Sequence, residues 1–433
     1  MSLKLLAVIP VLLASTLASA YNLNIDINEL KDDDDDSVVL AIPYAFYNEN
    51  TEVAAAVAVT TSGVYQPQTA MVFNAFYSSN DSSSVFFAFV DYQVPFLERL
   101  FIDGQVMYAN WGETESYQDG NPDFNNERAG SNDSDKNNFI LADGTDLHMR
   151  MYLKYLLPIG DGAGKPIHTF ATQGGLLIEG YEAGGRAWNP LTSGRTTVEL
   201  EPFYRDQNFN DEFDNDYDNI TSGLKLALKY DNTDWYINPS YGSKQTLSFA
   251  RDWGAQDASP TFSAVQFSYS KYIPLALGDN IRQRTLALNF WTSDVPTWNS
   301  SHTDNEGNEV FHRAPLFEGS TLGGIDRQRG FGTNRFHDRA AINYSAEYRV
   351  TPEWNPAPDI PLINVLPIPW WQWIGFIEVG RVAPSYSMSE LHRDMKVTVG
   401  AGFRVMLSDL VLRVDAAGSE EGGEVQMFFG HTY

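Results

Sequence analysis

Side chains between Ala341 and Val350 alternate strictly between two kinds. Every second position is apolar or aromatic, and the positions between carry amide, hydroxyl or charged groups. Because successive side chains of a β-strand point to opposite faces, a period of two predicts a strand. One face of this strand meets water. The other meets an apolar medium, which is either a protein core or lipid.

The same alternation recurs in segments of about ten residues that are separated by polar loops. The polar face repeatedly carries Lys, Arg, Glu and Gly together, as the wall of a water-filled lumen would, whereas the charge on a soluble sandwich is more diffuse. Clear examples are Val198–Tyr204, Leu224–Asp231, Thr285–Trp291, Lys396–Val405 and Leu410–Asp415. The pattern predicts an all-β fold, a transmembrane antiparallel β-barrel.

The number of candidate strands is odd if Val38–Tyr47 is one of them. Single-chain bacterial barrels have even strand numbers, which places both termini on the periplasmic side. We therefore predict about 16 strands. Val38–Tyr47 is then a lead-in or the least certain strand.

The N-terminus has the features of a secretory signal peptide. Lys4 precedes an apolar run, and Ala18-Ser19-Ala20 is a cleavage site of the small-x-small type. We expect residues 1–20 to be removed, residues 21–37 to form an acidic arm, and residues 38–433 to form the barrel. The run Asp32–Asp36 is either a solvated linker or a segment for calcium binding or docking.

Charge and hydropathy exclude several classes of protein. The chain has 433 residues, a formal net charge of −27 and no cysteine, and so acidic a protein disfavours nucleic acid as a partner. No second apolar run is long enough for a membrane-spanning helix, since Pro367 and Pro369 interrupt the nearest candidate. Together with export and alternation, this predicts a monomer in the bacterial outer membrane, with outer-membrane lipids as its surroundings.

Residue types that carry catalysis or bind metals are scattered. The seven His show no metal-ligand spacing, and no Gly-rich phosphate loop precedes a helix. The run Asp211–Asp218 lacks the Gly and the terminal Glu of an EF-hand loop, so we expect a solvated loop. The sequence therefore predicts no cofactor, no metal and no enzymatic activity.

Long polar connections are expected at residues 112–146, 207–222 and 292–334. Asp359–Trp373 is predicted to be the longest turn on the periplasmic side. Its Trp and Pro residues fit a segment that lies in the headgroup region of the membrane. The alternative is a plug that folds into the mouth of the lumen.

The stretch Leu322–Asn334 is Gly-rich and basic inside an otherwise acidic chain. It contains Arg329-Gly330-Phe331, and Phe376-Ile377-Glu378-Val379-Gly380 follows on a later predicted strand. With Gly400–Arg404 and Leu412–Asp415, these motifs resemble the barrel of the BamA/TamA/two-partner-secretion transporter superfamily, the bacterial surface antigen barrels. The resemblance is specific over roughly Leu224–Tyr433.

The resemblance implies that the Arg-Gly-Phe tip lies on an extracellular loop between strands eleven and twelve, which folds back into the lumen. It also implies that Glu378 occupies a position where the family usually has Asp. The transporters usually carry POTRA domains before the barrel, and residues 21–37 are too few for one. We therefore expect a member that lacks these domains.

The residues themselves also predict a latch between the loop and the wall. Alternation places Glu347, Phe376, Glu378 and Gly380 on the lumen face. An unpaired guanidinium is costly in a partly dehydrated lumen, so Arg329 needs acceptors such as Glu347 and Glu378. Gly330 would allow a tight turn, and Gly380 would leave room for the tip. The alternative is a surface loop whose Arg is merely solvated.

The function that the resemblance implies is insertion or translocation of polypeptides through the lumen or through a weak seam between the first and last strands. The clients would be unfolded outer-membrane or secreted polypeptides. Two alternatives remain open: a passive or gated pore for small solutes, and a structural or lipid-organising barrel. The final strand is expected at Val425–Tyr433, with His431 on its outward face.

Overall fold

The computed structural model describes residues 4–5, 38–48, 51–118, 120–185, 187–213, 215–254, 261–304, 307–361, 363–366, 368–407 and 410–433. The acidic arm and nearly all of the expected signal peptide lie outside the described residues. None of the described helices is long and apolar enough to cross a membrane.

The main sheet has 17 strands, of which β1 (Lys4–Leu5) is a two-residue strand parallel to β2. The remaining 16 strands pair antiparallel with their neighbours along the chain, which confirms the predicted fold class. They are β2 (Val38–Asn48), β3 (Glu52–Ser62), β4 (Ala70–Ser78), β5 (Ser83–Gln93), β6 (Leu100–Ser116), β7 (Ile140–Leu156), β10 (Arg195–Asp211), β11 (Asp216–Asp231), β12 (Gly242–Asp252), β13 (Phe262–Pro274), β14 (Ile281–Asp294), β19 (Ala340–Pro352), β20 (Trp371–Ala383), β21 (Lys396–Leu407), β22 (Leu410–Gly418) and β23 (Gly423–Phe429).

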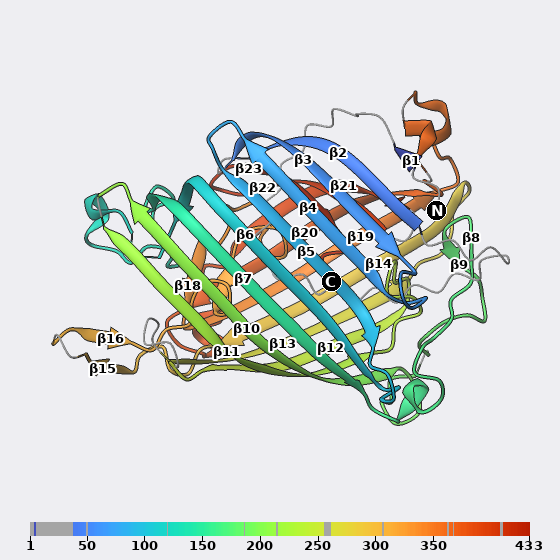
Figure 1. The fold of residues 1–433 in the computed structure, drawn as a ribbon, viewed down its shortest axis with the longest axis horizontal. Helices are drawn as coiled ribbons and strands as arrows, with labels where there is room; N and C mark the ends of the chain where they lie inside the picture. The colour runs from blue at the N-terminus through green and yellow to red at the C-terminus, as the bar shows by residue number, and fades with distance from the viewer. Residues whose placement is uncertain are drawn as a thin grey trace.

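Short elements occupy the connections. They are the hairpins β8 (Thr172–Gln173) with β9 (Leu176–Leu177), β15 (Ser301–Thr303) with β16 (Glu309–Phe311), and β17 (Ser320–Leu322) with β18 (Phe336–Asp338), the helix α1 (Met388–Leu391), and the 3₁₀ turns η1 (Pro122–Phe124), η2 (Gly160–Ala163), η3 (Ala357–Asp359) and η4 (Ile363–Val365). Figure 1 shows the tilted strands, with β15 and β16 at one end of the molecule and β8 and β9 at the other.

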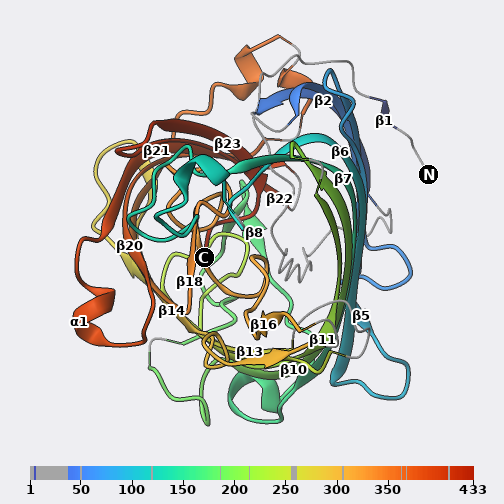
Figure 2. The same cartoon turned by 90° about the vertical axis from the view of Figure 1, so that its left-hand side faces the viewer.

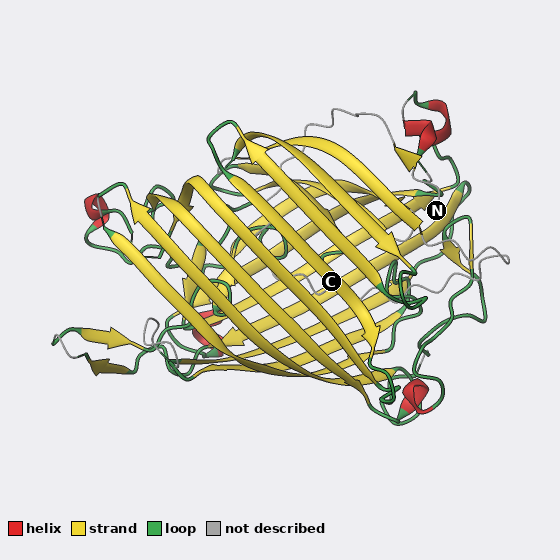
Figure 3. Cartoon of the chain, viewed as in Figure 1, coloured by secondary structure: helices red, strands yellow, loops and turns green. Residues whose placement is uncertain are grey.

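The strands curve into a ring around a lumen (Figure 2). Strand makes up most of the ribbon, and the helical turns lie in the connections (Figure 3). We call the end at which β2 begins and β23 ends the terminal end, and the opposite end the outward end. The connections 117–139 and 295–339 lie at the outward end, and 157–194 and 353–370 lie at the terminal end.

Burial along β19 is inverted relative to a water-soluble sheet. Glu347 and Arg349 point to the lumen and are 0% and 1% exposed, whereas Tyr344 and Tyr348 point outward and are 39% and 43% exposed. An apolar face that stays exposed while the polar face is buried is what a sheet surrounded by lipid requires. The same inversion in β11 leaves Leu224, Leu226 and Leu228 on the outside.

Of the two alternatives for Val38–Tyr47, the strand is right and the lead-in is wrong, because β2 pairs with β3 from Val38 to Asn48. The region 207–222 is not a long loop, because β10 and β11 remain paired up to Asn210 and Asp216 and leave only a tight turn. Backbone pairing does not require apolar side chains, so the β10–β11 ladder continues through these polar residues up to the tight turn.

The sheet does not close by backbone pairing, since no described residue of β23 pairs with β2. Instead, the outer face of the last strands packs against the inner face of the first ones. Leu412 and Val414 alternate with the lumenal Arg413 and Asp415 and so lie on the outer face of β22. They join Met427 in one apolar cluster with Phe46, Ala54 and Phe76 from the inner face of β2, β3 and β4.

The last two strands therefore tuck beneath the first strands, and Figure 2 shows β22 and β23 on the lumen side of β2. The inner position of Phe46 follows from its partner Ala54, which is 1% exposed while the adjacent Val53 is 59% exposed on the outside. The two ends of the sheet thus meet by side-chain packing alone over the described residues.

The inverted burial predicts the response to a charge on the outer face. Leu226→Arg should destabilise the folded barrel by about 2–4 kcal/mol if its position lies near the bilayer midplane. Heat-modifiable migration of the reconstituted protein on semi-native gels measures the loss. Leu226→Phe at the same position is the control and should leave migration unchanged. Equal stability of the two variants in lipid would contradict a lipid-facing β11.

Candidate functional site: the lumenal loop and its anchors

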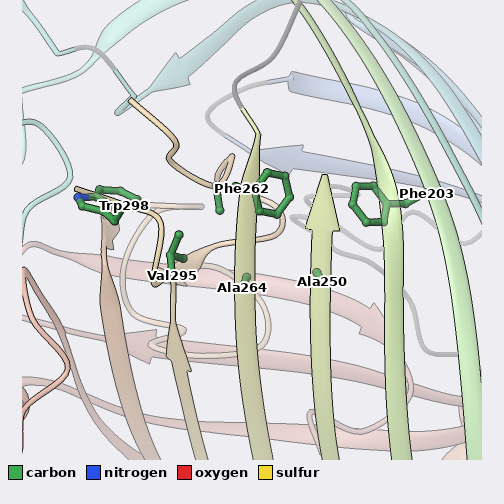
Figure 4. Close-up of a cluster of buried hydrophobic side chains, with 7 residues drawn as sticks. Phe203, Ala250, Phe262, Ala264, Val295 and Trp298 are labelled. Carbon is green, nitrogen blue, oxygen red and sulfur yellow. The ribbon is translucent and has the colours of Figure 1, made fainter. Parts of the chain in front are cut away.

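The connection between β14 and β19, residues 295–339, enters the lumen and packs on its wall. Its first part contributes Val295, Trp298 and Ala314 to an apolar cluster with Phe203 of β10 and Phe262 of β13. Ala250 and Ala264 complete this cluster (Figure 4). These wall residues sit at lumenal positions near the outward end, so the loop is bound to the wall from its first residues.

Arg329 reaches the opposite part of the wall, where carboxylates from three strands surround it. Its Nη1 lies 2.9 Å from Glu347 Oε1 and 2.7 Å from Asp415 Oδ2, and its Nε lies 3.0 Å from Glu378 Oε1. Its backbone N–H donates to Glu378 Oε2 at 2.8 Å. The guanidinium carbon also lies 3.5 Å from the centre of the Phe376 ring. Charge, hydrogen bonds and a cation–π contact thus all fix one side chain.

The carboxylates also compensate neighbouring guanidiniums. Arg349 pairs with Glu347 at 2.7 Å, Arg404 with Asp415 at 2.5 Å, and Arg413 with Asp326 at 3.6 Å. Arg329 and its three carboxylates are at most 2% exposed. Burial disfavours the charge on Arg329, but the carboxylates outweigh that cost and hold its pKa above the usual value. The charges are therefore balanced inside a nearly closed space, which makes the network stable only as a unit.

Glycines allow the loop tip to approach the wall. A Cβ on Gly330 would lie 2.8 Å from the carbonyl carbon of Gly418, and one on Gly380 would lie 2.7 Å from Asn343 Oδ1. Gly330 lies in a tight turn, as predicted, since the Phe331 N–H donates to the carbonyl of Gln328 at 3.0 Å. The left-handed residue of the tip is Gln328, with φ of 56°, so Gly330 is needed for close packing as well as for the turn.

Phe331 anchors the tip through apolar contacts. It is 1% exposed and packs with Leu322, Phe336 and the wall residues Trp291 and Val382 in a second buried cluster, which Ala341 completes. Its ring lies edge-on to Phe336 at 5.0 Å between centroids. All seven residues predicted for the latch, Arg329, Gly330, Phe331, Glu347, Phe376, Glu378 and Gly380, therefore meet at one place in the lumen.

Glu318 forms a second ionic anchor of the same loop, which the sequence analysis did not find. Its carboxylate accepts from Arg150 of β7 and lies 2.8 Å from Lys225 Nζ of β11. Gln266 Nε2 donates to its backbone carbonyl at 3.2 Å. The side chain is fully buried, so both cations are needed to offset its desolvation. The loop is thus tied to two separate regions of the wall.

A third contact joins the loop to other connections at the outward end. Arg335 donates to the backbone carbonyl of Ser134 at 2.6 Å and pairs with Glu421 at 2.8 Å. Nearby, burial and the guanidiniums of Arg128 and two other arginines lower the pKa of His337 to about 3. Three connections therefore share one buried cover over the lumen.

The last residues of the chain turn into the lumen, and the terminus lies inside the ring (Figure 2). β23 ends at Phe429 rather than at Tyr433, and His431 is not on the outward face as predicted. His431 and Tyr433 line a polar cavity of about 340 Å³ together with Lys225, Lys229 and Tyr272. Thr432 Oγ1 accepts from Arg329 Nη1 at 3.3 Å, which links this segment to the latch.

The sequence analysis missed Asp415 as an acceptor, although a signal was present. Asp415 alternates with Val414 on the polar face of its strand, two positions after Arg413. Its role depends on curvature of the sheet, which brings β22 across from β19. Within the described ranges, no group of three or more His, Asp or Glu side chains is arranged to hold a metal ion.

A β-barrel with a long loop latched inside its lumen defines a class of membrane proteins. Residues 189–417 match the model of the Omp85 superfamily domain, so the chain belongs to the Omp85 superfamily. No curated protein sequence matches it.

Solved structures show the same architecture. CdiB from Escherichia coli matches with a TM-score of 0.54 at 10% identity, over 91% of this chain and 61% of CdiB. CdiB from Acinetobacter baumannii matches with a TM-score of 0.52 at 10% identity, over 91% of this chain and 59% of that protein. BamA from Haemophilus ducreyi lacking POTRA domains 1–3 matches at 11% identity and a TM-score of 0.48, over 91% and 69%. The chain thus spans about three-fifths of each CdiB protein.

The Arg329 network should fail as a unit. Arg329→Ala and Glu378→Ala should each destabilise the barrel by about 3 kcal/mol, because each leaves buried charges unpaired. The double variant should be little worse than either single one. The midpoint of heat-modifiable migration measures the three effects. Arg393→Ala, which removes a half-exposed arginine, is the control. Additive losses would contradict the pairing.

Glu318 and Arg329 should instead act independently, because their partners lie on different strands. Glu318→Gln should destabilise the barrel by roughly 1–3 kcal/mol, the cost of unpaired buried charge. Its effect should add to that of Arg329→Ala within about 0.5 kcal/mol. Glu309→Gln, on an exposed hairpin of the same loop, provides the control. Strong coupling between the two anchors would show that they form one network.

Proposed function

We propose that this barrel inserts or translocates polypeptides in the bacterial outer membrane and that its working surface is the seam between β2 and β23. The observation that carries this proposal is that no described residue of β23 pairs with β2. Over the same residues, this edge of β2 is paired at Leu40 and Ala41 alone, with β1. Family membership supports polypeptides as the general class of client. The acidic, cysteine-free chain supplies no catalytic constellation, and we propose that it acts without enzymatic chemistry.

An unpaired strand edge is unstable in a membrane. Its N–H and C=O groups cannot bond to water within the hydrocarbon, so each needs a partner. A strand of another chain satisfies them by β-augmentation. The apolar overlap of β22–β23 with β2–β4 holds the edges together without such bonds and can separate without breaking a ladder. The seam therefore suits transient pairing with an extended client.

The lumen is a less favourable route for a polypeptide than the seam between β2 and β23. The loop 295–339 is tied inside it by Glu318, by Arg329 and by two apolar clusters. Passage of a chain or of a solute through this space requires several buried ion pairs to break together. A pore for small solutes remains an alternative outcome, because a polar cavity of about 340 Å³ lies beside the loop.

A disulfide across the overlap tests the proposal. Phe46→Cys with Met427→Cys places one thiol on each side of the seam in a chain that otherwise has no cysteine. The oxidised variant should lose the ability to speed folding of an unfolded outer-membrane barrel in proteoliposomes, and reduction should restore it. Thr60→Cys with Val72→Cys, across the ordinary β3–β4 pair, provides the control.

Full activity of the oxidised seam variant would contradict the proposal. Ion conductance measured on the same proteoliposomes distinguishes the alternative. A pore would conduct equally in the locked and reduced states and would show no effect on client folding.

A further inference from the structure

The connection between β7 and β10, residues 157–194, is the longest described segment between strands at the terminal end. From the sequence, Asp359–Trp373 was predicted to be the longest turn there, lying either in the headgroup region or as a plug in the lumen mouth. Trp370 fits the second alternative, since it is 1% exposed and lies within the lumen mouth, while Trp373 is 52% exposed on the outer face. Leu362 lies outside the described residues, and Ile363 and Leu366 are half-buried.

The inner part of the connection, residues 166–183, fills the lumen mouth. Phe170 packs with Trp370, Trp235 and the lumenal residues Met406 and Val411 in one buried cluster. The indole of Trp370 donates to the carbonyl of Gly175 at 2.5 Å. Arg282 of β14 donates to the carbonyl of Gly174 at 2.8 Å. The inner part thus contacts several sides of the ring and forms a plug.

The outer part, residues 187–193, crosses the rim onto the outer face of the barrel. Tyr230 belongs to the outward row of β11, yet it is only 6% exposed, while Leu228 in the same row is 48% exposed. The outer part covers it: Tyr230 Oη donates to the carbonyl of Ser193 at 3.1 Å, and Trp188 packs edge-on to its ring at 6.2 Å.

Trp188 and Leu191 remain open to the surroundings at this position, with exposures of 64% and 71%. The surface continues the outward apolar rows of β11 and β12, where Leu228 and Leu247 are 48% and 50% exposed. Trp188 also directs its indole N–H to Gln245 Oε1 at 3.1 Å. An indole with a satisfied N–H and an exposed ring at the end of a lipid-facing row fits the boundary between headgroups and acyl chains.

One side chain ties the two parts together. Asn232 Nδ2 donates to the carbonyls of Gly185 and Ala187, and its Oδ1 accepts from the backbone N–H of Gly185 at 2.8 Å. Ala183 N–H donates to the carbonyl of Asp234 in the same turn at 2.8 Å. The plug and the exposed outer part therefore share one rigid attachment to the β11–β12 turn.

We propose that residues 187–193 form a lipid-binding anchor, with Trp188 and Leu191 in the headgroup boundary at the terminal end, which holds the plug 166–183 in the lumen mouth. The partner is a lipid surface, recognised by an exposed indole and an aliphatic side chain. The inference depends on the orientation of the barrel in a membrane and not on its client. A failure of the seam experiment would leave it untouched.

The lipid contact is tested with a fluorophore on Leu191→Cys, since the chain has no other thiol. In proteoliposomes its emission should shift to shorter wavelength, and spin labels near the lipid headgroup should quench it. The same fluorophore on Lys165→Cys, an exposed position on the same connection, is the control and should remain unquenched. Absence of quenching at Leu191 would overturn the anchor.

The coupling to the plug is tested by conductance. Trp188→Ser with Leu191→Ser should raise conductance in planar bilayers, as Phe170→Ala should through direct loss of plug packing. Trp354→Ser removes an exposed tryptophan from the other long connection at the terminal end and should leave conductance unchanged. Heat-modifiable migration shows that each variant is folded. Unchanged conductance in a folded double variant would overturn the coupling, and so would an equal rise in the control.

Discussion

Compensation of buried charge inside the lumen is the constraint on which the rest of this structure depends. The sheet exposes its apolar face and turns its polar face inward, so the charges of Arg329, Glu347 and Glu378 are compensated by other buried side chains of the lumen, Asp415 and Arg349 among them. A guanidinium in this space is costly alone and stable within a complete set. The position of the loop that pairs Arg329 with these carboxylates also sets how much of the lumen is filled.

The loop that fills the lumen and the unpaired ends of the sheet are best considered together. A loop held at Glu318 and at Arg329 supports the wall from inside, which lets β2 and β23 meet without a hydrogen-bonded ladder. The contact at the seam is an apolar cluster, whereas the latch consists of buried ion pairs. Rearrangement at the seam breaks apolar contacts, whereas rearrangement in the lumen breaks buried ion pairs, and this difference is the physical basis on which we propose lateral handling of polypeptides.

The latch could be predicted from the sequence to a large degree. Arg329, Glu347, Phe376, Glu378 and Gly380 were found because strand alternation assigns each to a face and the family motif connects the loop with its strand. Asp415 and Glu318 could not be paired with them, because their proximity depends on ring curvature and on the path of the loop. For Gly330 the predicted tight turn is present, but only the structure shows a second reason for glycine, the close approach of Gly418.

The sequence by itself determined the class of fold and the inward face of the clearly alternating strands. Period-two alternation is a local property of each strand, so it can be recognised without knowing which strand pairs with it. Only the tertiary structure decided how the sheet ends meet, where Trp370 and His431 lie, and which segment plugs the terminal end. These features arise from contacts between residues distant along the chain, and closure of the sheet into a ring brings those residues together.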